Sequence, residues 1–323
     1  MIKKINIGIV GLGEHMIRAH IKHLVTMPNV EIVRWFDPND KAEISCFDSL
    51  AQKPLSSSFE EIINDELINV VFIGSPDQYH AKQLLECVQA GKSVFCEKPM
   101  AVSMEERQIL KDALLITKEK GLTISSCHPR RFDPPFVWLK KQLDNKSWVE
   151  ENFGKITDFI FDFWYHEVTD NWKKDRSLLK DHFGHEIDLY RFLFGSNHGW
   201  KAEKEFDGYD GYKVSGISKD KMFPNFTFTG YRSLTEKVYQ ETVTIKGIKN
   251  ALVIQLNTGN AVWMKDCATE IIPKIDYDAR FILVNENFIK AVKKESESYL
   301  SEEDMLVNNI SSIELCAEKY FIF

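Results

Sequence analysis

The 323-residue sequence lacks any apolar run near the roughly 18 residues that a membrane-spanning helix needs. It also lacks an excess of positive charge, because 48 acidic side chains against 41 basic ones give a net charge of −7. Nucleic acids and anionic membranes bind basic faces, so we expect neither as a partner. A strand-like run begins at Ile5 and leaves no secretory segment before it, and we therefore expect a cytoplasmic protein.

Cysteine pairs with metal-binding or redox spacing are missing as well. The 6 cysteines are scattered along the chain, and no Cys-x-x-Cys motif occurs. We therefore expect reduced thiols and no metal site. With 44% hydrophobic and 28% charged residues, the remaining composition is that of an ordinary globular protein. A chain of this length exceeds one ordinary core, so we expect two domains.

Residues 1–126 alternate between strand-like and helix-like patterns. Buried-strand runs include residues 5–10, 31–36, 69–74, 93–96 and 122–126, the last of which is counted as the sixth strand. Capping boxes begin at Ser58 and Ser103, and Gly91 and Gly121 stop the helices before them. We expect an α/β domain with a doubly wound parallel sheet of the Rossmann type, containing six strands.

A glycine-rich turn follows the first strand and opens a helix. Gly11 and Gly13 allow a tight turn, in which backbone N–H groups can approach a pyrophosphate at the positive helix end. The third glycine of a dinucleotide fingerprint is absent, because Met16 occupies its position, so we expect the helix slightly further from the strand. We assign Gly11, Gly13, Glu14, His15 and Met16 to cofactor binding.

An acidic residue, Asp37, ends the second strand, 24 residues after Gly13. A carboxylate at this position can bind the adenosine ribose hydroxyls and repels a 2′-phosphate. We therefore expect NAD rather than NADP as the cofactor. The alternative is that residues 37–40, Asp-Pro-Asn-Asp, form only a turn.

Charged residues follow the strand at 93–96, in the segment Glu97-Lys98-Pro99. Ligands of open α/β sheets bind just past the carboxyl ends of the strands. Charge at such a point is costly unless it is paired or used. Taken alone, the segment indicates a Glu–Lys pair that closes a strand.

Residues 127–323 have a different texture and form the predicted second domain. Strand patterns at residues 155–168, 241–246 and 251–256 favour an α+β domain with a broad, mostly antiparallel sheet. Helices are expected at residues 178–194, 281–294 and 302–319. The pattern leaves open whether the C-terminal helices pack back on the first domain.

The helix expected at residues 178–194 carries Asp181 and His185, which are i,i+4 neighbours on one face. An Asp beside a His can orient the ring for general acid–base chemistry near neutral pH. One alternative is a simple ion pair on the helix surface. A metal held by Asp181, His182 and His185 is a weaker alternative, because His182 lies off their common face.

Taken together, these segments resemble the Gfo/Idh/MocA family of NAD(P)-dependent oxidoreductases, the glucose–fructose oxidoreductase and inositol dehydrogenase group. The resemblance covers nearly the whole chain. The segments that carry it are Gly8–Gly13, Ser75–His80, Ala90–Met100, Arg130–Pro134, Asp181–Asp188 and Leu193–Gly195.

The resemblance implies roles for particular residues. Lys98 would contact the substrate and the nicotinamide ribose, and its bond to Pro99 would be cis. Asp181 and His185 would be the acid–base pair. The positions implied to border the cofactor are Ser75, Pro76, His80, Glu97 and Lys98.

The chain departs from the family pattern at three places. Met16 replaces the third glycine, and Asp77 stands where the family often has asparagine. In the family, a glycine usually lies between the acid and the histidine that match Asp181 and His185. Here that glycine is one position later in the sequence, at Gly184, and Phe183 occupies its usual position. The last departure bears on the shape of the pocket beneath the nicotinamide.

The resemblance implies reversible hydride transfer between NAD(H) and a secondary alcohol or ketone of a sugar, nucleotide-sugar or cyclitol. It further implies a homodimer or homotetramer formed through the C-terminal sheet. Two alternatives remain open: a non-catalytic, dinucleotide-sensing regulatory protein of the same fold, and an NAD-dependent enzyme that processes glycosides.

Overall fold

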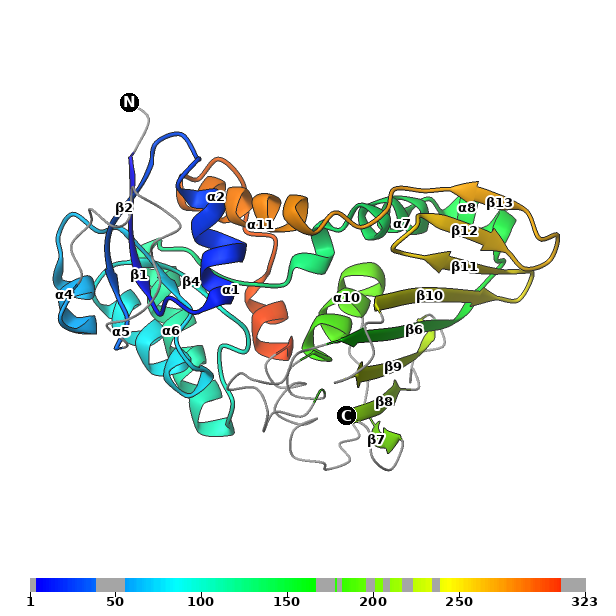
Figure 1. Ribbon diagram of the computed structural model, residues 1–323, viewed down its shortest axis with the longest axis horizontal. Coiled ribbons are helices and arrows are strands. Elements are labelled where there is room, and N and C mark those ends of the chain that lie inside the picture. The colour runs from blue at the N-terminus through cyan, green and yellow to red at the C-terminus, as the bar shows by residue number, and fades with distance from the viewer. Residues whose placement is uncertain are drawn as a thin grey trace. The chain divides into compact units, whose positions relative to one another are not determined.

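The computed structural model describes residues 4–38, 56–166, 178, 182–195, 201–205, 210–216, 223–233 and 239–308 (Figure 1). These residues separate into two compact units. The first contains the described residues within 4–129 and 278–308, and the second those within 130–277. None of the described helices is long and apolar enough to cross a membrane.

The first unit contains a parallel sheet with the strand order β2-β1-β3-β4-β5. Its strands are β1 (Ile5–Val10), β2 (Val30–Phe36), β3 (Val70–Ile73), β4 (Ser93–Cys96) and β5 (Ile124–Ser126). β3, β4 and β5 are buried at every residue, as expected where helices cover both faces of a parallel sheet. The predicted Rossmann architecture is confirmed. The expected six strands are wrong for the described residues, which form five.

Of the two capping boxes expected in the first unit, the one at Ser103 is formed, whereas Ser58 precedes its helix without a side-chain cap hydrogen bond. The helices of this unit include α4 (Phe59–Asn64), α5 (His80–Gln89), α6 (Met104–Lys120) and α11 (Tyr277–Val292). At the start of α6, the Ser103 hydroxyl accepts from Glu106 N at 3.1 Å, and the Glu106 carboxylate accepts from Val102 N at 2.7 Å. Gly121 ends α6 with a φ of 63°, so both predicted helix signals are confirmed there.

The helix after the glycine turn is continuous but changes its winding. It consists of α1 (Glu14–Met16), a π-helical turn, η1 (Ile17–Ile21), and α2 (Lys22–Leu24). Such π turns are rare and are frequently found at functional sites. The buried His20 lies in this turn.

Aromatic side chains join α11 to the sheet of the first unit. The rings of Phe72 on β3 and Phe95 on β4 stack at 5.0 Å between centroids. Phe288 of α11 meets Phe72 edge to face at 5.5 Å, and all three side chains are fully buried. The sequence segment after residue 278 therefore contributes to the core of the first unit.

The second unit contains an eight-stranded sheet with the order β13-β12-β11-β10-β6-β9-β8-β7. The strands are β6 (Ile156–His166), β7 (Lys201–Glu205), β8 (Asp210–Gly216), β9 (Asn225–Ser233), β10 (Tyr239–Gly247), β11 (Ala251–Gln255), β12 (Asn260–Trp263) and β13 (Thr269–Ile271). Only β6 and β9 pair in parallel, so the predicted mostly antiparallel sheet is confirmed. Along β6, buried Phe159, Phe161 and Phe163 alternate with more exposed residues, which leaves one face for the core.

The helices of the second unit are α7 (Pro134–Asp144), α8 (Lys146–Asn152) and α10 (Gly184–Phe194), preceded by the 3₁₀ turn η3 (Pro129–Phe132). Of the helix expected at residues 178–194, Leu178 is helical and α10 begins at Gly184, while residues 179–181 lie outside the described residues. His182 and Phe183 form a turn before it, in which His182 N donates to Leu178 O at 2.9 Å. Of the helix expected at 302–319, residues 302–308 are helical, and the remainder lies outside the described residues.

Candidate active site

The glycine turn leaves its backbone open at one residue and tightly packed at another. Gly11 has a φ of +84°, and a Cβ there would lie 2.5 Å from the backbone nitrogen of Ser75. Only glycine fits this position. Gly13, at the start of α1, is exposed, and a Cβ there would meet nothing within 4 Å. The turn therefore offers open space beside the first N–H groups of the helix, which fits a pyrophosphate.

Met16, which stands in place of the third glycine, is accommodated by a glycine elsewhere. Its side chain is buried, and its terminal methyl lies 2.5 Å from the point where a Cβ of Gly74 would stand. Gly74 directly follows β3. The helix therefore packs closely on the sheet because Gly74, at the end of β3, has no side chain. A glycine on the helix itself is not required.

Asp37 is held against the glycine turn. One of its carboxylate oxygens accepts a hydrogen bond from Leu12 N at 2.6 Å. At the adjacent point, Gly11 N donates to Phe36 O at 2.8 Å, so the ends of β1 and β2 are tied together. The structure therefore brings the predicted ribose-binding carboxylate to the predicted pyrophosphate turn.

His80 links the ends of β3 and β4. Its Nε2 lies 2.7 Å from Ser75 O, and its Nδ1 lies 2.7 Å from Pro99 O. Burial lowers the pKa of His80 and outweighs the opposing effect of the two carbonyl groups. A neutral imidazole has a single N–H, so the ring donates to one carbonyl at a time. His80 is buried and joins the segment after β3 to the segment after β4. Pro76, in the first of these segments, is exposed.

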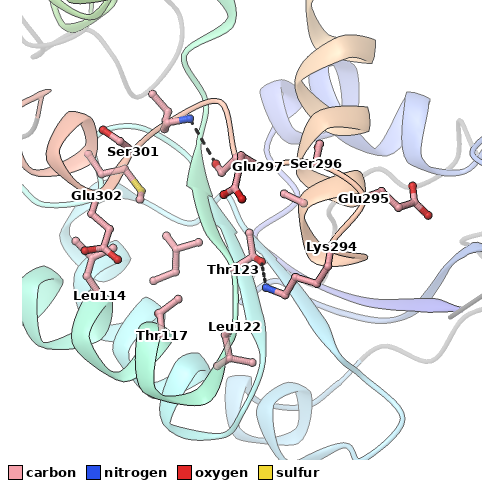
Figure 2. A pocket seen from close by; sticks show the side chains of 15 residues that line it. Leu114, Thr117, Leu122, Thr123, Lys294, Glu295, Ser296, Glu297, Ser301 and Glu302 are labelled. Atoms are coloured by element: carbon pink, nitrogen blue, oxygen red, sulfur yellow. Dashed lines mark hydrogen bonds between the residues drawn. The ribbon is translucent and has the colours of Figure 1, made fainter.

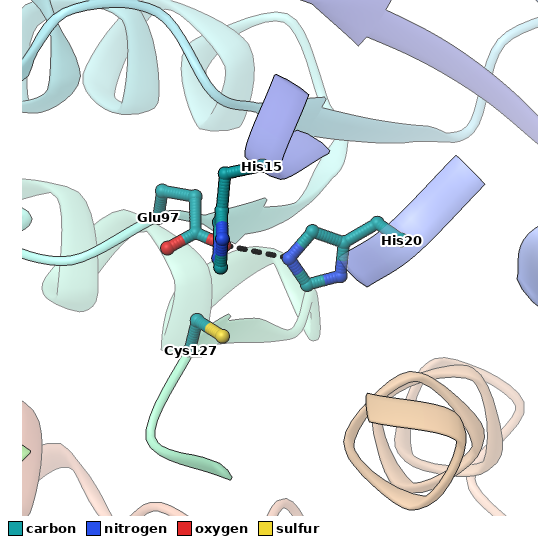
Figure 3. A group of neighbouring side chains, drawn as sticks. All are labelled: His15, His20, Glu97 and Cys127. Atoms are coloured by element: carbon teal, nitrogen blue, oxygen red, sulfur yellow. Dashed lines mark hydrogen bonds and ion pairs between the residues drawn. The ribbon is translucent and has the colours of Figure 1, made fainter. Parts of the chain in front are cut away.

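Glu97 is surrounded by two histidines of the first helix (Figure 3). Its Oε1 lies 2.6 Å from Nε2 of His20 and 3.2 Å from Nε2 of His15. Burial alone would raise the pKa of Glu97, but the two histidines hold it well below its usual range. The next residue, the half-buried Lys98, precedes Pro99 with a cis peptide bond, as expected.

The partners of His20 define its protonation. Asn285 of α11 donates from Nδ2 to Ala19 O at 2.9 Å, and this contact turns its Oδ1 toward the His20 ring. His20 Nδ1 lies 2.7 Å from that oxygen and therefore donates to it. Its Nε2 faces a carboxylate that is ionised, so it donates as well. His20 and Glu97 thus form a buried ion pair that Asn285 orients.

Cys127 completes a group that could hold a metal ion. The ligand atoms of His15, His20, Glu97 and Cys127 all lie within 4.8 Å of one another, and their nitrogen, oxygen and sulfur atoms suit zinc. Both histidines, however, point at the same oxygen of Glu97 rather than around a common centre. Burial and the charge of Glu97 raise the pKa of the Cys127 thiol. The group is satisfied by its own hydrogen bonds.

A hollow of about 760 Å³ lies elsewhere in the first unit (Figure 2). Its lining includes Leu122, Thr123 and Lys294, and Lys294 Nζ lies 3.3 Å from Thr123 Oγ1. Leu122 and Thr123 precede β5, so the hollow is at the amino end of that strand. Ligands of this architecture bind at the carboxyl ends, and the hollow is therefore not the predicted cofactor site.

In the second unit, the expected acid–base residues can be followed only in part. Asp181 lies outside the described residues, and the half-buried His185 is the second residue of α10. The carboxylate–histidine contact that the structure contains joins His182 Nδ1 to Glu186 Oε2 at 3.1 Å. The sequence prediction missed this pair, although the i,i+4 spacing that drew attention to Asp181 and His185 also applies to it.

Two arginines that follow the first unit in the chain are buried among carboxylates. Arg130 lies 3.0 Å from Glu186 and 2.6 Å from Glu241. Arg131 binds both oxygens of Asp188, at 2.9 and 2.7 Å. The sequence analysis named Arg130 and Arg131 only within the segment Arg130–Pro134 that carries the family resemblance, and assigned them no role.

The sheet order, the glycine turn and the separate antiparallel sheet define the class of two-unit proteins with an NAD-binding Rossmann fold. Residues 5–126 match the sequence model described as "Oxidoreductase family, NAD-binding Rossmann fold" (GFO_IDH_MocA). Residues 5–126 belong to this family, as the sequence motifs indicate.

Curated relatives include dehydrogenases of sugars and cyclitols. Glucose-6-phosphate 3-dehydrogenase of Bacillus subtilis is 38% identical over 238 residues, which cover 68% of this chain and 66% of the relative. The scyllo-inositol 2-dehydrogenase (NADP(+)) IolW of the same organism is 34% identical over 140 residues, covering 42% and 37%. The aligned region thus spans less than two thirds of the length of these relatives.

Solved structures share the fold over nearly the full length. Scyllo-inositol dehydrogenase from Lactobacillus casei, with bound NAD(H) and scyllo-inositol, has a TM-score of 0.76 at 18% identity and covers 98% of this chain and 97% of its own. Biliverdin reductase from Synechocystis sp. PCC 6803, in complex with biliverdin and NADP+, has a TM-score of 0.78 at 14% identity, covering 97% and 98%. At these identities the similarity concerns the fold alone.

Proposed function

We propose that the protein transfers a hydride reversibly between NAD(H) and a secondary alcohol or ketone of a sugar, nucleotide-sugar or cyclitol. The observation that carries the proposal is the hydrogen bond from Leu12 N to Asp37 at 2.6 Å, next to the open turn at Gly13. This contact supports the proposal, because the Asp37 carboxylate and the open turn then lie together at the carboxyl ends of β1 and β2, where a dinucleotide would bind. The family of residues 5–126 and the curated sugar and cyclitol dehydrogenases support the same activity.

NAD is the cofactor we propose, because the Asp37 carboxylate would repel the 2′-phosphate of NADP. The relatives include proteins of both kinds, among them an NADP(+)-dependent and an NAD(+)-dependent scyllo-inositol 2-dehydrogenase of Bacillus subtilis. The cofactor choice therefore rests on Asp37 alone.

In oxidation, His185 would accept the hydroxyl proton while the carbon gives its hydride to the nicotinamide, the chemistry that the bound cofactor supplies. Lys98 would donate a hydrogen bond to the same oxygen and stabilise the developing alkoxide. Asp181 would orient the His185 ring. We further propose that the enzyme works in the cytoplasm as a homodimer or homotetramer formed through the sheet of the second unit.

Cofactor choice can be measured by thermal shift. We expect NAD to raise the melting temperature at concentrations at which NADP does not, because only bound ligand stabilises the folded state. The better cofactor is then used with a panel that contains glucose 6-phosphate, scyllo-inositol, myo-inositol and nucleotide-sugars. A preference for NADP would refute the role of Asp37. Binding of NAD without turnover of any panel member would favour the regulatory alternative.

Replacement of the proposed acid–base groups gives the second test. Lys98→Ala and His185→Ala should each lower turnover by about 10²-fold or more, because each removes a group that acts on the reacting oxygen. The shift in melting temperature with NAD should persist in both variants. Lys111→Ala, which replaces another half-buried lysine, in α6, is the matched control and should retain its rate. Near-normal turnover in either test variant would refute the corresponding assignment.

A further inference from the structure

His182 is held in a fixed orientation from two sides. Its ring stacks on Phe163 at 4.2 Å between centroids with 24° between the planes, and on Tyr165 at 5.3 Å with 30°. Its Nδ1 lies 3.1 Å from Oε2 of Glu186. These contacts fix both the plane of the ring and its rotation within that plane. A surface ion pair, in contrast, would leave the ring mobile.

Glu186 owes its charge and its place to a buried network. Its carboxylate is fully buried, and Oε1 lies 3.0 Å from Nε of Arg130. Arg130 also lies 2.6 Å from Glu241 on β10, and its guanidinium sits 4.8 Å above the Phe161 ring. Burying one arginine with two carboxylates costs free energy compared with apolar packing, so such a network is more often retained for a site than for stability.

The network determines which nitrogen of His182 is available. Glu186 is ion-paired with Arg130 at 3.0 Å, and an ionised carboxylate can only accept hydrogen bonds. His182 Nδ1 must therefore carry the proton of that contact, and Nε2 is the nitrogen that can gain or lose a proton. Arg130 is shared between Glu186 and Glu241, so its single positive charge does not neutralise both carboxylates. The negative charge that remains on Glu186 can stabilise a positive charge on the His182 ring.

His185 is a second histidine beside this ring. The two ring centroids lie 5.8 Å apart with 79° between the planes; His182 is in the turn before α10, and His185 is the second residue of that helix. Rings at this separation can exchange a proton directly or through one bridging water. About a fifth of the His182 side chain is exposed, at 20%, whereas Glu186 is sealed off. Among the described residues, the charged and titratable groups around His182 are Glu186 and His185 of α10, Tyr165 of β6, Arg130 of η3 and Glu241 of β10.

We propose that His182 carries protons between His185 and solvent, with Glu186 and Arg130 as its positioning residues. This inference rests on the proposed function of His185. In oxidation, the substrate hydroxyl loses its proton to His185 and its carbon-bound hydride to NAD. His185 then passes that proton to Nε2 of His182, and Nε2 releases it to water, while the Nδ1 proton stays on the Glu186 contact. Reduction runs the same steps in reverse, with the proton taken from solvent.

Steady-state kinetics with the panel substrate that is turned over provides the test. His182→Phe keeps the stack on Phe163 and removes both nitrogens. We expect its turnover number to fall about tenfold in dilute buffer and to recover when imidazole is added at constant ionic strength, with little change in KM. Wild type should not respond to imidazole. The matched control is Lys249→Gln, which removes an exposed titrating group of the same unit and should behave like wild type.

A second measurement needs no substrate. In protein labelled with ¹⁵N-histidine, the nitrogen shifts of His182 should show the proton on Nδ1 at all pH values where the protein is folded, with only Nε2 titrating. Glu186→Gln should abolish this preference for Nδ1. Circular dichroism and the melting temperature identify variants that fail to fold. If a variant fails, the nitrogen shifts of wild-type His182 still test whether its proton is on Nδ1.

The outcomes separate this inference from the proposed function. A His182→Phe enzyme with a full turnover number in dilute buffer, or one whose loss imidazole does not restore, overturns the proton-carrying role. A wild-type ring protonated on Nε2 alone does the same. If His185→Ala keeps its activity, or no panel member is turned over, the proposed function fails and this inference fails with it.

Discussion

At the scale of single residues, Glu97 shows how a carboxylate can remain charged without exposure to water. It is only 8% exposed, and its ionised form is stabilised by His15 and His20. Removing a charge partner from such a group costs more than removing both, because a buried group then remains unsatisfied. The ion pair also joins the first helix to the segment that carries Lys98. We therefore expect Glu97 to matter for both stability and activity.

The lowered pKa of Glu97 predicts the pH dependence of stability. A carboxylate whose folded pKa lies below its ordinary value of 4.5 contributes stability that is fully present above pH 4.5. The contribution is lost as the pH falls through the lower folded value. We expect the free energy of unfolding of wild type to decrease below pH 4.5, and that of Glu97→Gln to decrease less steeply. Urea unfolding at a series of pH values measures both.

The control for this prediction is Glu119→Gln, which replaces an exposed carboxylate near the end of α6. Its pH dependence should parallel that of wild type. Equal slopes for Glu97→Gln and wild type below pH 4.5 would show that the histidines do not hold Glu97 ionised.

At the scale of the elements, β1, β3 and β4 could be predicted because each is a short apolar run bounded by turn residues, as a buried parallel strand requires. The glycine turn was predictable because it is a local feature: few residue types can adopt the backbone conformation that it requires. The contact between Met16 and Gly74 was not, because it joins residues 58 positions apart whose relation depends on how helix and sheet meet.

The candidate site was predictable only where its residues are neighbours in sequence. Leu12 and Asp37 could be related through the dinucleotide pattern. Asn285 could not be related to His20, because the contact spans 265 residues and has no periodic signal. In the second unit, the environment of His182 could not be predicted, because its ring contacts a residue of β6 that has no periodic relation to it. The actual turn before Gly184 places its ring on Phe163.

The two glycines of the turn predict different results when each becomes alanine. In Gly13→Ala the new Cβ meets nothing within 4 Å and φ is −61°, so folding should change by less than about 1 kcal/mol. That Cβ occupies the space open to the pyrophosphate, so NAD affinity should fall at least about tenfold, or about 1.4 kcal/mol. Isothermal titration calorimetry and urea unfolding measure the two effects.

Gly11→Ala provides the contrast, because its Cβ would lie 2.5 Å from Ser75 N at a φ of +84°. This variant should lose stability as well as affinity, by about 1–3 kcal/mol. A Gly13→Ala protein that binds NAD normally would show that the turn does not approach the pyrophosphate.

At the scale of the whole molecule, the proposed cofactor contacts belong to one of the two units. The glycine turn, Asp37, Ser75 and Glu97 all lie before residue 129, and Asn285 of α11 completes the first unit through its contact with His20. A ligand that binds the folded state stabilises the elements it holds by mass action. The contacts of Asn285 extend this stabilisation to a helix nearly 200 residues further along the chain than Glu97.

Hydrogen exchange with and without saturating NAD tests whether the cofactor contacts belong to the first unit. We expect the largest slowing at residues 8–16, 36–38 and 74–80, and a measurable slowing along α11, because α11 holds His20 through Asn285. Strands β10 and β11 of the second unit should change less, since none of the predicted dinucleotide contacts lies on them. In Asn285→Ala, the slowing should persist at the glycine turn and diminish along α11. Equal slowing of α11 in wild type and this variant would show that the helix responds to NAD by a route other than the His20 contact.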